Sequence, residues 1–237
     1  MTLPFRTGNR VYQSEGWAGL TISLLEERIV LESPDTLRML SSSVNLGGFA
    51  HGERVVNWEV PLSYRGTDPE EDMKSRLAEW GYSAERTVGL LTAAKLTHAS
   101  ILEEDGDCCH LISCTTAGTR NAARSGLPRP TFSAYRPGTI NTIIAVNGAM
   151  TDSAMVNALI TAVEAKSAAL QDLGIVDPDN GLLATGTTTD AIVLAVSQRS
   201  ELGVVHPYAG AATTIGNAIG RLVYETVYEA VRTQHDN

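Results

Sequence analysis

The sequence has no long apolar run of the kind that a membrane-spanning helix requires. No stretch approaches the ~18 residues of a span, and the start, MTLPFRTGNR, lacks the apolar centre of a secretory signal. Basic residues are also scarce: 18 Lys and Arg stand against 27 Asp and Glu, giving a formal net charge of −9. That balance disfavours attraction to nucleic-acid phosphates or anionic membranes. We therefore expect a cytoplasmic protein with neither nucleic acid nor membrane as partner.

Cysteine is equally sparse. Cys108, Cys109 and Cys114 form an odd set without C-x-x-C spacing, which argues against a disulfide framework. Cys108, His110 and Cys114 would share one face of a regular strand, but no fourth ligand is evident, and core packing explains them better than a metal. G-x-S-x-G, H-E-x-x-H, P-loop and Rossmann motifs are also missing. We expect neither a metal site nor a cofactor.

What the chain does contain is 237 residues, 43% of them hydrophobic, enough for one substantial core. Because no repeat or convincing linker interrupts it, we expect a single domain over residues 1–237. Its N-terminal half predicts strand hairpins around residues 26–28 and around Asp105-Gly106-Asp107, where the glycine suits a turn. Further strands are predicted at 54–60 and 88–96. Between them lies a helix capped by Thr67 and ended by Gly81.

The C-terminal half predicts a strand at 140–147, a helix at 152–173, a strand at 190–197 and a final helix. Thr151 suits the N-cap of the first helix and Gly174 its end. Each helix carries one apolar stripe that should cover a sheet. The stripes are Val156, Leu159, Ile160, Val163 and Leu170 in the first helix, and Ile215, Ile219, Leu222, Val223 and Val227 in the last.

Hairpins followed by long helices indicate an α+β fold, with antiparallel or mixed sheets and helices layered on them, rather than a doubly wound parallel sheet. Two sheets between two helical layers would be the more specific form. Residues 125–138, which include three prolines, are predicted to form a long loop that either borders a site or joins two halves of the domain.

Hydroxyl and carboxylate side chains gather in Thr185-Gly186-Thr187-Thr188-Thr189-Asp190, directly before an apolar strand. This loop could present amide N–H groups and hydroxyls to a polarised carbonyl, with Gly186 allowing a substrate close to the backbone amides and Asp190 steering a proton or a water. It could equally satisfy the amides of a turn. Lys166 is a second candidate because it falls within the apolar stripe of its helix, near Glu164. A lysine there could act in catalysis or extend past the edge of the stripe.

Three other loops carry candidate binding residues. Asn121, in the loop 115–126, could hold a substrate amide or help to form an oxyanion hole, and its arginines could bind a carboxylate or phosphate. Glycines elsewhere could allow close approach of a ligand, and the amides before the last helix could favour an acceptor. Ordinary turns explain all three loops as well. The residues concerned are Gly118, Thr119, Arg120 and Arg124 in the first loop, Asn45, Gly47 and Gly48 in 41–49, and His206, Tyr208 and Gly210 in 206–220.

Taken together, six segments resemble the adenosylcobinamide amidohydrolase family. They occur in order from about residue 40 to the end of the chain. The family pattern has glycine where this chain has Thr188, and some members have a Thr-His pair where this chain has Ala211-Ala212. The segments are VPLSY (60–64), VGLLTAAKL (88–96), TTAGTRNA (115–122), INTIIAVNGAMTDSAMVNALITAVEAKSAAL (140–170), ATGTTTDAIVLA (184–195) and YAGAATTIGNAIGRLV (208–223).

The resemblance implies hydrolysis of the amide between the aminopropanol arm and the corrin ring of adenosylcobinamide, giving adenosylcobyric acid and 1-amino-2-propanol in corrinoid salvage. The corrinoid is then substrate rather than cofactor, and a homo-oligomer is compatible with this function. A corrinoid-binding or carrier protein without catalysis is the alternative. For hydrolysis, Asp190 is the first choice as base or orienter, Thr187 or Thr119 as nucleophile, and Lys166 or His206 as acid.

A further resemblance concerns architecture. The order of strand 140–147, helix, Gly/Thr loop and strand 190–197 is similar to the second half of DmpA and ornithine acetyltransferase-like hydrolases, which are αββα sandwiches. Those enzymes cleave themselves to expose a nucleophile, but this chain shows no recognisable cleavage site. The resemblance therefore implies the layers and not the self-processing.

Overall fold

The computed structural model describes residues 3–129 and 139–236. Within them, nine strands form one mixed sheet in the order β1-β2-β3-β12-β9-β7-β6, with β4 and β5 branching from β3. These strands are β1 (Val11–Gln13), β2 (Thr21–Leu25), β3 (Arg28–Ser41), β4 (Gly48–Glu59), β5 (Thr87–Thr92), β6 (Ser100–Gly106), β7 (Cys109–Ala117), β9 (Ile140–Asn147) and β12 (Ala191–Val196).

The helices and shorter elements surround this sheet. Two two-stranded ribbons, β10–β13 and β11–β8, lie outside it. Their bounds are β8 (Ala122–Ala123), β10 (Ala149–Met150), β11 (Gly186–Thr187) and β13 (Val205–His206). The helices are α1 (Pro69–Glu79), α2 (Asp152–Asp172) and α3 (Thr214–Thr233), with short 3-10 turns at Pro4–Thr7, Leu96–His98 and Ser200–Leu202.

The long strand β3 makes the sheet curl. One edge of β3 pairs with β4 along both of its halves, and the register shifts between Glu32 and Leu37. Its other edge pairs first with β2 and then, beyond the shift, with β12. A bulge of this kind bends a strand and increases its twist. The β2–β5 half of the sheet therefore turns to face the half that contains β6, β7, β9 and β12.

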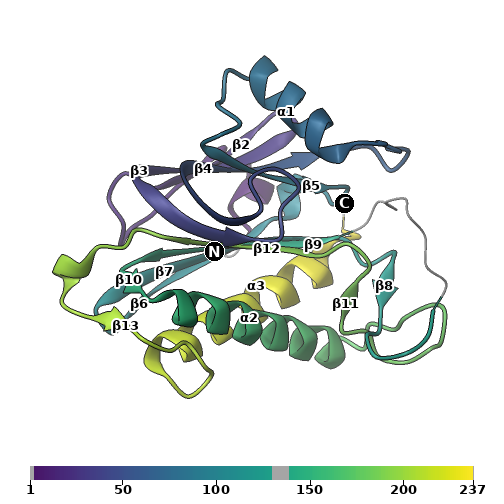
Figure 1. Cartoon of the computed structure of the whole chain (residues 1–237). Coiled ribbons are helices and arrows are strands. Elements are labelled where there is room, and N and C mark those ends of the chain that lie inside the picture. The colour runs from purple at the N-terminus through teal and green to yellow at the C-terminus, as the bar shows by residue number, and fades with distance from the viewer. Residues whose placement is uncertain (1–2, 130–138, 237) are drawn as a thin grey trace.

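Three apolar clusters fill the spaces that this curl creates. One lies between the two halves of the sheet and includes Leu31, Val55 and Ile143. The second lies between the other face of β6, β7, β9 and β12 and the helices α2 and α3, and the third lies under α1. Figure 1 shows α1 on one side of the sheet and α2 and α3 on the other. This confirms the predicted α+β class with a mixed sheet and layered helices.

Helix ends follow the sequence closely. Thr151 caps α2 by accepting a hydrogen bond from the Ala154 amide at 3.1 Å. Gly174 follows α2 with a φ of 66°, the left-handed conformation that glycine adopts at little cost. The prediction for α1 was wrong by one residue. Asp68 rather than Thr67 is its N-cap, because the Asp68 carboxylate accepts from the Glu71 amide at 3.1 Å.

The predicted stripe on α3 is confirmed, because all five of its apolar residues are buried. The predicted stripe on α2 was wrong in three places: Val156, Ile160 and Val163 are 48%, 52% and 43% exposed. The buried face of α2 consists mainly of small residues and of Met155, Lys166 and Leu170. Periodicity misled the prediction because α2 packs against α3 as well as the sheet, and alanines allow that close approach.

The strands also required corrections. The hairpin turn between β6 and β7 is Asp107-Cys108, with Cys108 at a φ of 56°, whereas Gly106 ends β6. A Cβ on Gly106 would lie 2.7 Å from the Cys109 sulfur, so glycine is required there for packing and not for the turn. Residues 130–138 of the predicted loop lie outside the described residues. In the described part of the chain, no helix is long and apolar enough to cross a membrane.

We expect Ile219→Ala to lower the free energy of unfolding by about 3 kcal/mol, because Ile219 is fully buried on the inner face of α3. Ile160→Ala removes the same atoms from the exposed face of α2 and should cost less than about 0.5 kcal/mol. Urea unfolding of both variants measures the difference. Equal losses would mean that Ile160 is in the core after all.

Candidate active site

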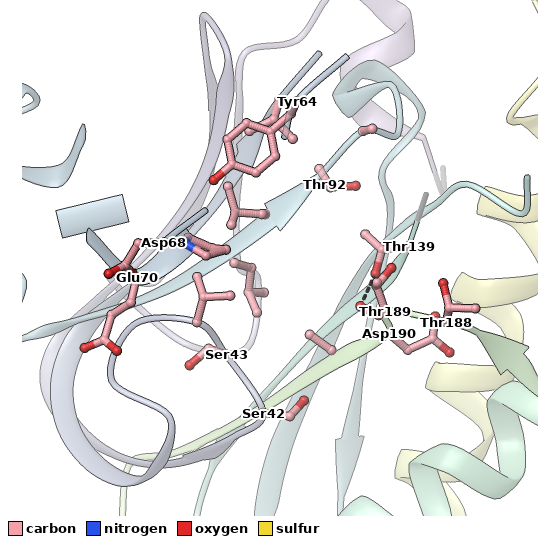
Figure 2. Close-up of a pocket in the computed structure, with 17 residues that line it drawn as sticks. Ser42, Ser43, Tyr64, Asp68, Glu70, Thr92, Thr139, Thr188, Thr189 and Asp190 are labelled. Carbon is pink, nitrogen blue, oxygen red and sulfur yellow. Dashed lines mark hydrogen bonds between the residues drawn. The ribbon is translucent and has the colours of Figure 1, made fainter. Parts of the chain in front are cut away.

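A cavity of about 520 Å³ opens beside the loop that precedes β12. Its walls are the end of β3, the end of β5, the start of α1 and residues 188–191. Figure 2 shows hydroxyl and carboxylate side chains pointing into it from these elements. The polar lining residues are Ser42, Ser43, Tyr64, Asp68, Glu70, Thr92, Thr139, Thr188, Thr189 and Asp190, with no lysine or arginine among the described lining residues.

Asp190 is the most heavily bonded carboxylate on this wall. Its Oδ1 accepts from the Thr187 hydroxyl at 2.5 Å and from the Ile140 amide at 3.1 Å. Its Oδ2 accepts from the Thr187 amide at 3.0 Å and from the Lys166 ammonium. The Asp190 side chain is only 13% exposed. A carboxylate so placed is held in one orientation, with a hydroxyl on one oxygen and a cation on the other.

Lys166 reaches Asp190 from the buried face of α2. The ion pair joins residues far apart in the sequence, and both side chains are largely removed from water. Glu164, the partner suggested by the sequence, is exposed and does not pair with Lys166. A buried ammonium needs a counter-ion, so the structure brings together Lys166, Asp190 and Thr187, three of the five predicted catalytic residues.

Gly186 makes this ion pair sterically possible. A Cβ at Gly186 would lie 2.4 Å from Asp190 Oδ2 and 2.9 Å from Lys166 Nζ. The sequence suggested that Gly186 lets a substrate approach the backbone. The structure gives a different reason, which is that the ion pair packs directly against the Gly186 Cα.

Asn121 holds the neighbouring part of the loop. Its side-chain amide donates to the Thr188 hydroxyl at 2.7 Å and to the Thr189 hydroxyl at 3.3 Å. Thr188 lines the cavity, and its own hydroxyl proton has no acceptor among the described residues. Asn121 thus belongs to this site through Thr188, a residue of the hydroxyl-rich loop that was not among the predicted site residues.

Sequence reasoning also missed three further residues that line the cavity. Thr92 is buried at the end of β5, Thr139 precedes β9, and Tyr64 lies before α1. Each is separated in the sequence from the hydroxyl-rich loop. Their positions at strand ends were the only available signal, because that is where polar groups of an active site usually gather.

The remaining candidates of the 115–126 and 182–190 loops bond to the protein itself. The amide and hydroxyl of Thr119 both donate to Gln234, at 2.8 and 3.1 Å. The Thr185 hydroxyl accepts from the Ser125 amide at 3.0 Å, and Arg124 donates to the Leu183 carbonyl at 2.8 Å. Gly118 and Arg120 are not among the residues that line the cavity, and Arg120 is exposed.

Asn45 serves the fold rather than the cavity. Its buried side-chain amide donates to the carbonyls of Ala84 and Thr87, at 2.9 and 2.7 Å. Gly48 adopts a φ of 77°, and a Cβ on Gly47 would lie 2.8 Å from the Ser43 carbonyl oxygen. Both glycines therefore meet the needs of a tight turn. None of the three residues lines the cavity.

His206, Tyr208 and Gly210 lie at the other end of the sheet. β13, which contains His206, pairs with β10 just beyond the far end of β9. β9 has eight residues, so it separates the two ends by about 25 Å. Figure 1 shows the two ribbons, β10–β13 and β8–β11, at opposite ends of α2. The structure does not bring His206 to Asp190.

The cysteine and histidine residues of β7 are not assembled for a metal. His110 lies between Glu103 and Asp105, at 2.9 and 2.7 Å, and Cys108 is exposed. Burial raises the pKa of Cys114 to about 12 and that of Cys109 to about 11. In the residues that the structure describes, no group of three or more His, Cys, Asp and Glu side chains could hold a metal ion.

Comparison with known proteins assigns the chain to a class. A family model described as adenosylcobinamide amidohydrolase matches residues 18–237. The adenosylcobinamide amidohydrolase of Methanosarcina mazei is 31% identical over 194 residues, covering 79% of this chain and 86% of that protein. The protein of the same name from Halobacterium salinarum is 32% identical over 200 residues, covering 80% and 78%. The chain is therefore a hydrolase of amide bonds. It belongs to the adenosylcobinamide amidohydrolase family, as the six segments predicted.

Among solved structures, the PH0078 protein from Pyrococcus horikoshii aligns with 98% of this chain and 86% of its own. The TM-score is 0.45 and the sequence identity 10%, below the range that indicates a shared fold. The predicted likeness to DmpA is not confirmed by this comparison.

We expect Gly186→Ala to destabilise the protein by about 1–3 kcal/mol and to lower its turnover, because the added methyl group must displace Asp190 or Lys166. Gly210→Ala is the matched control, since its Cβ would meet nothing closer than Asn157 Oδ1 at 3.5 Å. Thermal unfolding and activity are measured for both. A fully active and stable Gly186→Ala variant would contradict the described packing.

Proposed function

We propose that this protein hydrolyses the amide between the aminopropanol arm and the corrin ring of adenosylcobinamide, in corrinoid salvage. The observation that carries the proposal is the Asp190 carboxylate at the cavity wall, which joins a hydroxyl on one oxygen to a buried ammonium on the other. The family membership supports the reaction, and the corrinoid is its substrate. We expect no cofactor to take part.

Thr187 is the proposed nucleophile. Four donors occupy Asp190, and only the Thr187 hydroxyl among them can attack a carbonyl carbon. In the first step the Thr187 oxygen bonds to the amide carbon while its proton passes to Asp190 Oδ1. The C–N bond then breaks, and the leaving amine takes that proton to become 1-amino-2-propanol. Water cleaves the resulting ester, which releases adenosylcobyric acid and restores the Thr187 hydroxyl.

Two neighbours support this chemistry. Lys166 balances the negative charge of Asp190, so the carboxylate stays in place although it is largely buried. Thr188 offers its free hydroxyl proton to the carbonyl oxygen, on which negative charge develops, and Asn121 orients that hydroxyl. Lys166 is thus proposed as a charge-balancing group and not as the acid suggested by the sequence.

The acidic character of the cavity suits the leaving group. Asp68 and Glu70 line the wall across from Asp190, and 1-amino-2-propanol is a cation once it is protonated in water. A corrinoid carrier without catalysis, the alternative considered from the sequence, is not favoured by the family membership. A cytoplasmic location and a homo-oligomer remain expectations from the sequence.

We also propose that the layers correspond to an αββα sandwich like that of DmpA and the ornithine acetyltransferases. Support comes from the three separate apolar clusters, one between the halves of the curled sheet and one beneath the helices on each side. Of the helices in the described residues, α1 covers the outer face of the β2–β5 half.

The first test is product analysis by mass spectrometry after the purified protein is mixed with adenosylcobinamide, with and without a chelator. We expect adenosylcobyric acid and 1-amino-2-propanol in equal amounts, and no effect of the chelator. Substrate that binds but remains intact would favour the carrier function. Substrate that does not bind would reject the proposed substrate.

Substitution of Asp190 and Thr187 tests the roles of the residues. Asp190→Asn and Thr187→Val should each lower turnover by roughly 100-fold or more, because the base or the nucleophile is lost. Thr187→Ser keeps the hydroxyl and should stay active. Asp177→Asn is the matched control for Asp190, since Asp177 is also buried and pairs with a cation, Arg129 at 2.9 Å.

Turnover and thermal unfolding are measured together for these variants. Asp177→Asn should lose stability without a selective loss of turnover. Full activity in Asp190→Asn would return Asp190 to a turn-capping role. Full activity in Thr187→Val would rule out Thr187 as nucleophile.

A further inference from the structure

A line of buried amides and hydroxyls crosses the space between the two halves of the sheet beside the cavity. The Asn57 side-chain amide, from β4, donates to the Thr116 hydroxyl of β7 at 2.9 Å. The Asn141 amide, from β9, donates to Asn57 Oδ1 at 2.8 Å. All three residues are at most 2% exposed. Burying a polar group costs free energy unless the group is hydrogen-bonded. These bonds therefore restrict the position of one half of the sheet relative to the other.

Asn141 is the branching point of this line. Besides Asn57, its amide donates to the Leu91 carbonyl at 2.8 Å, and its Oδ1 accepts from the Thr139 hydroxyl at 3.1 Å. Both donor hydrogens and one acceptor position are therefore in use. Leu91 belongs to β5 and lines the cavity. The side-chain amide of Asn141 is thus hydrogen-bonded to the β5 wall of the cavity.

The oxygen of the Asn141 side chain leads to the catalytic wall. The single proton of the Thr139 hydroxyl is shared between Asn141 Oδ1 and the Thr189 carbonyl, which lies at 2.6 Å. The amide of Ile140 donates to Asp190 Oδ1 at 3.1 Å. Figure 2 shows the bond from Thr139 to Thr189 at the cavity edge. The Thr139 side chain and the Ile140 amide therefore both hydrogen-bond to the loop that contains Asp190.

We propose that Asn141 is a positioning residue, which sets the separation between the β5 wall and the Asp190 wall of the cavity. The inference rests on the proposed function. Substrate held against β5 and α1 must present its amide carbon to Thr187, whose hydroxyl bonds to Asp190 on the opposite wall. Asn141 bonds to the Leu91 carbonyl of β5, and the Thr139 hydroxyl links it to the loop that carries Asp190. Errors of about 1 Å in such an alignment can reduce the rate of the chemical step by roughly 100-fold.

The test is the steady-state kinetics of Asn141→Asp with adenosylcobinamide. Aspartate has the same shape and can still accept from Thr139, but it cannot donate to Leu91 or Asn57 and places a carboxylate against both acceptors. We expect kcat to fall by roughly 100-fold while KM changes by less than about threefold, because the binding wall persists and only its alignment is lost.

Thr226→Val is the matched control. Thr226 is fully buried and bonds to the hydroxyls of Ser113 and Thr115, at 3.0 Å each, on the helix-facing side of the same sheet. It should lose thermal stability and keep kcat. If Asn141→Asp fails to fold, Asn57→Ala serves instead. It leaves the bond to Leu91 and should lower kcat by roughly tenfold.

Four results would overturn the inference. Two concern Asn141→Asp: an unchanged kcat, or a rise in KM that accounts for the whole loss of kcat/KM. The third is a loss of kcat in Thr226→Val that matches the loss in Asn141→Asp. The fourth is an absence of turnover in the wild type. The last would also reject the proposed function. The other three arise with an active wild-type enzyme and reject the positioning role alone.

Discussion

The change of partner along one edge of β3 is the constraint on which the rest of the structure depends. Because β4 occupies the other edge, β2 and β12 must share the remaining one, on either side of the shift between Glu32 and Leu37. The one strand β3 thereby belongs to both halves of the sheet. The halves then face each other, and the cavity forms where the ends of β3 and β5 meet the start of β12.

The Lys166–Asp190 ion pair fixes the second boundary of that cavity. It joins α2 to the loop before β12, while the Ile140 amide adds β9 to the same carboxylate. Replacing one member of a buried pair leaves the other charge without compensation, which typically costs about 3–5 kcal/mol. The same carboxylate also accepts a hydrogen bond from the Thr187 hydroxyl. Gly186 is the small residue that allows both.

The sequence predicted features that depend on local chemistry. Thr151 and Gly174 bound α2 as expected because caps act within one turn, and the α3 stripe is correct because a single face of that helix is buried. The family was also predicted, from the order of its segments. The stripe on α2 was not, because periodicity cannot distinguish a face buried by small residues from one that carries larger residues toward solvent.

Longer-range features of the site were beyond prediction. The sequence indicates Asp190 as a candidate, but its partner Lys166 lies 24 positions earlier, where the local pattern suggests Glu164 as the partner of Lys166. Asn57 and Asn141 gave no signal because neither belongs to a catalytic motif and their hydrogen-bond partners lie in other strands. His206 resembled a catalytic residue by type only, and the direction of β9 carries it to the opposite end of the sheet. Such pairings depend on topology, which local patterns do not contain.

The position of β12 also has a consequence for how the chain folds during synthesis. β12 inserts between β3, from the first fifth of the sequence, and β9, and it pairs with both. Contacts of such large sequence separation form slowly, because a long loop must close before they contribute. Until β12 leaves the ribosome, β3 and β9 each retain an unpaired edge. Asp190 directly precedes β12, so a nascent chain acquires its carboxylate wall only in the last stage of folding.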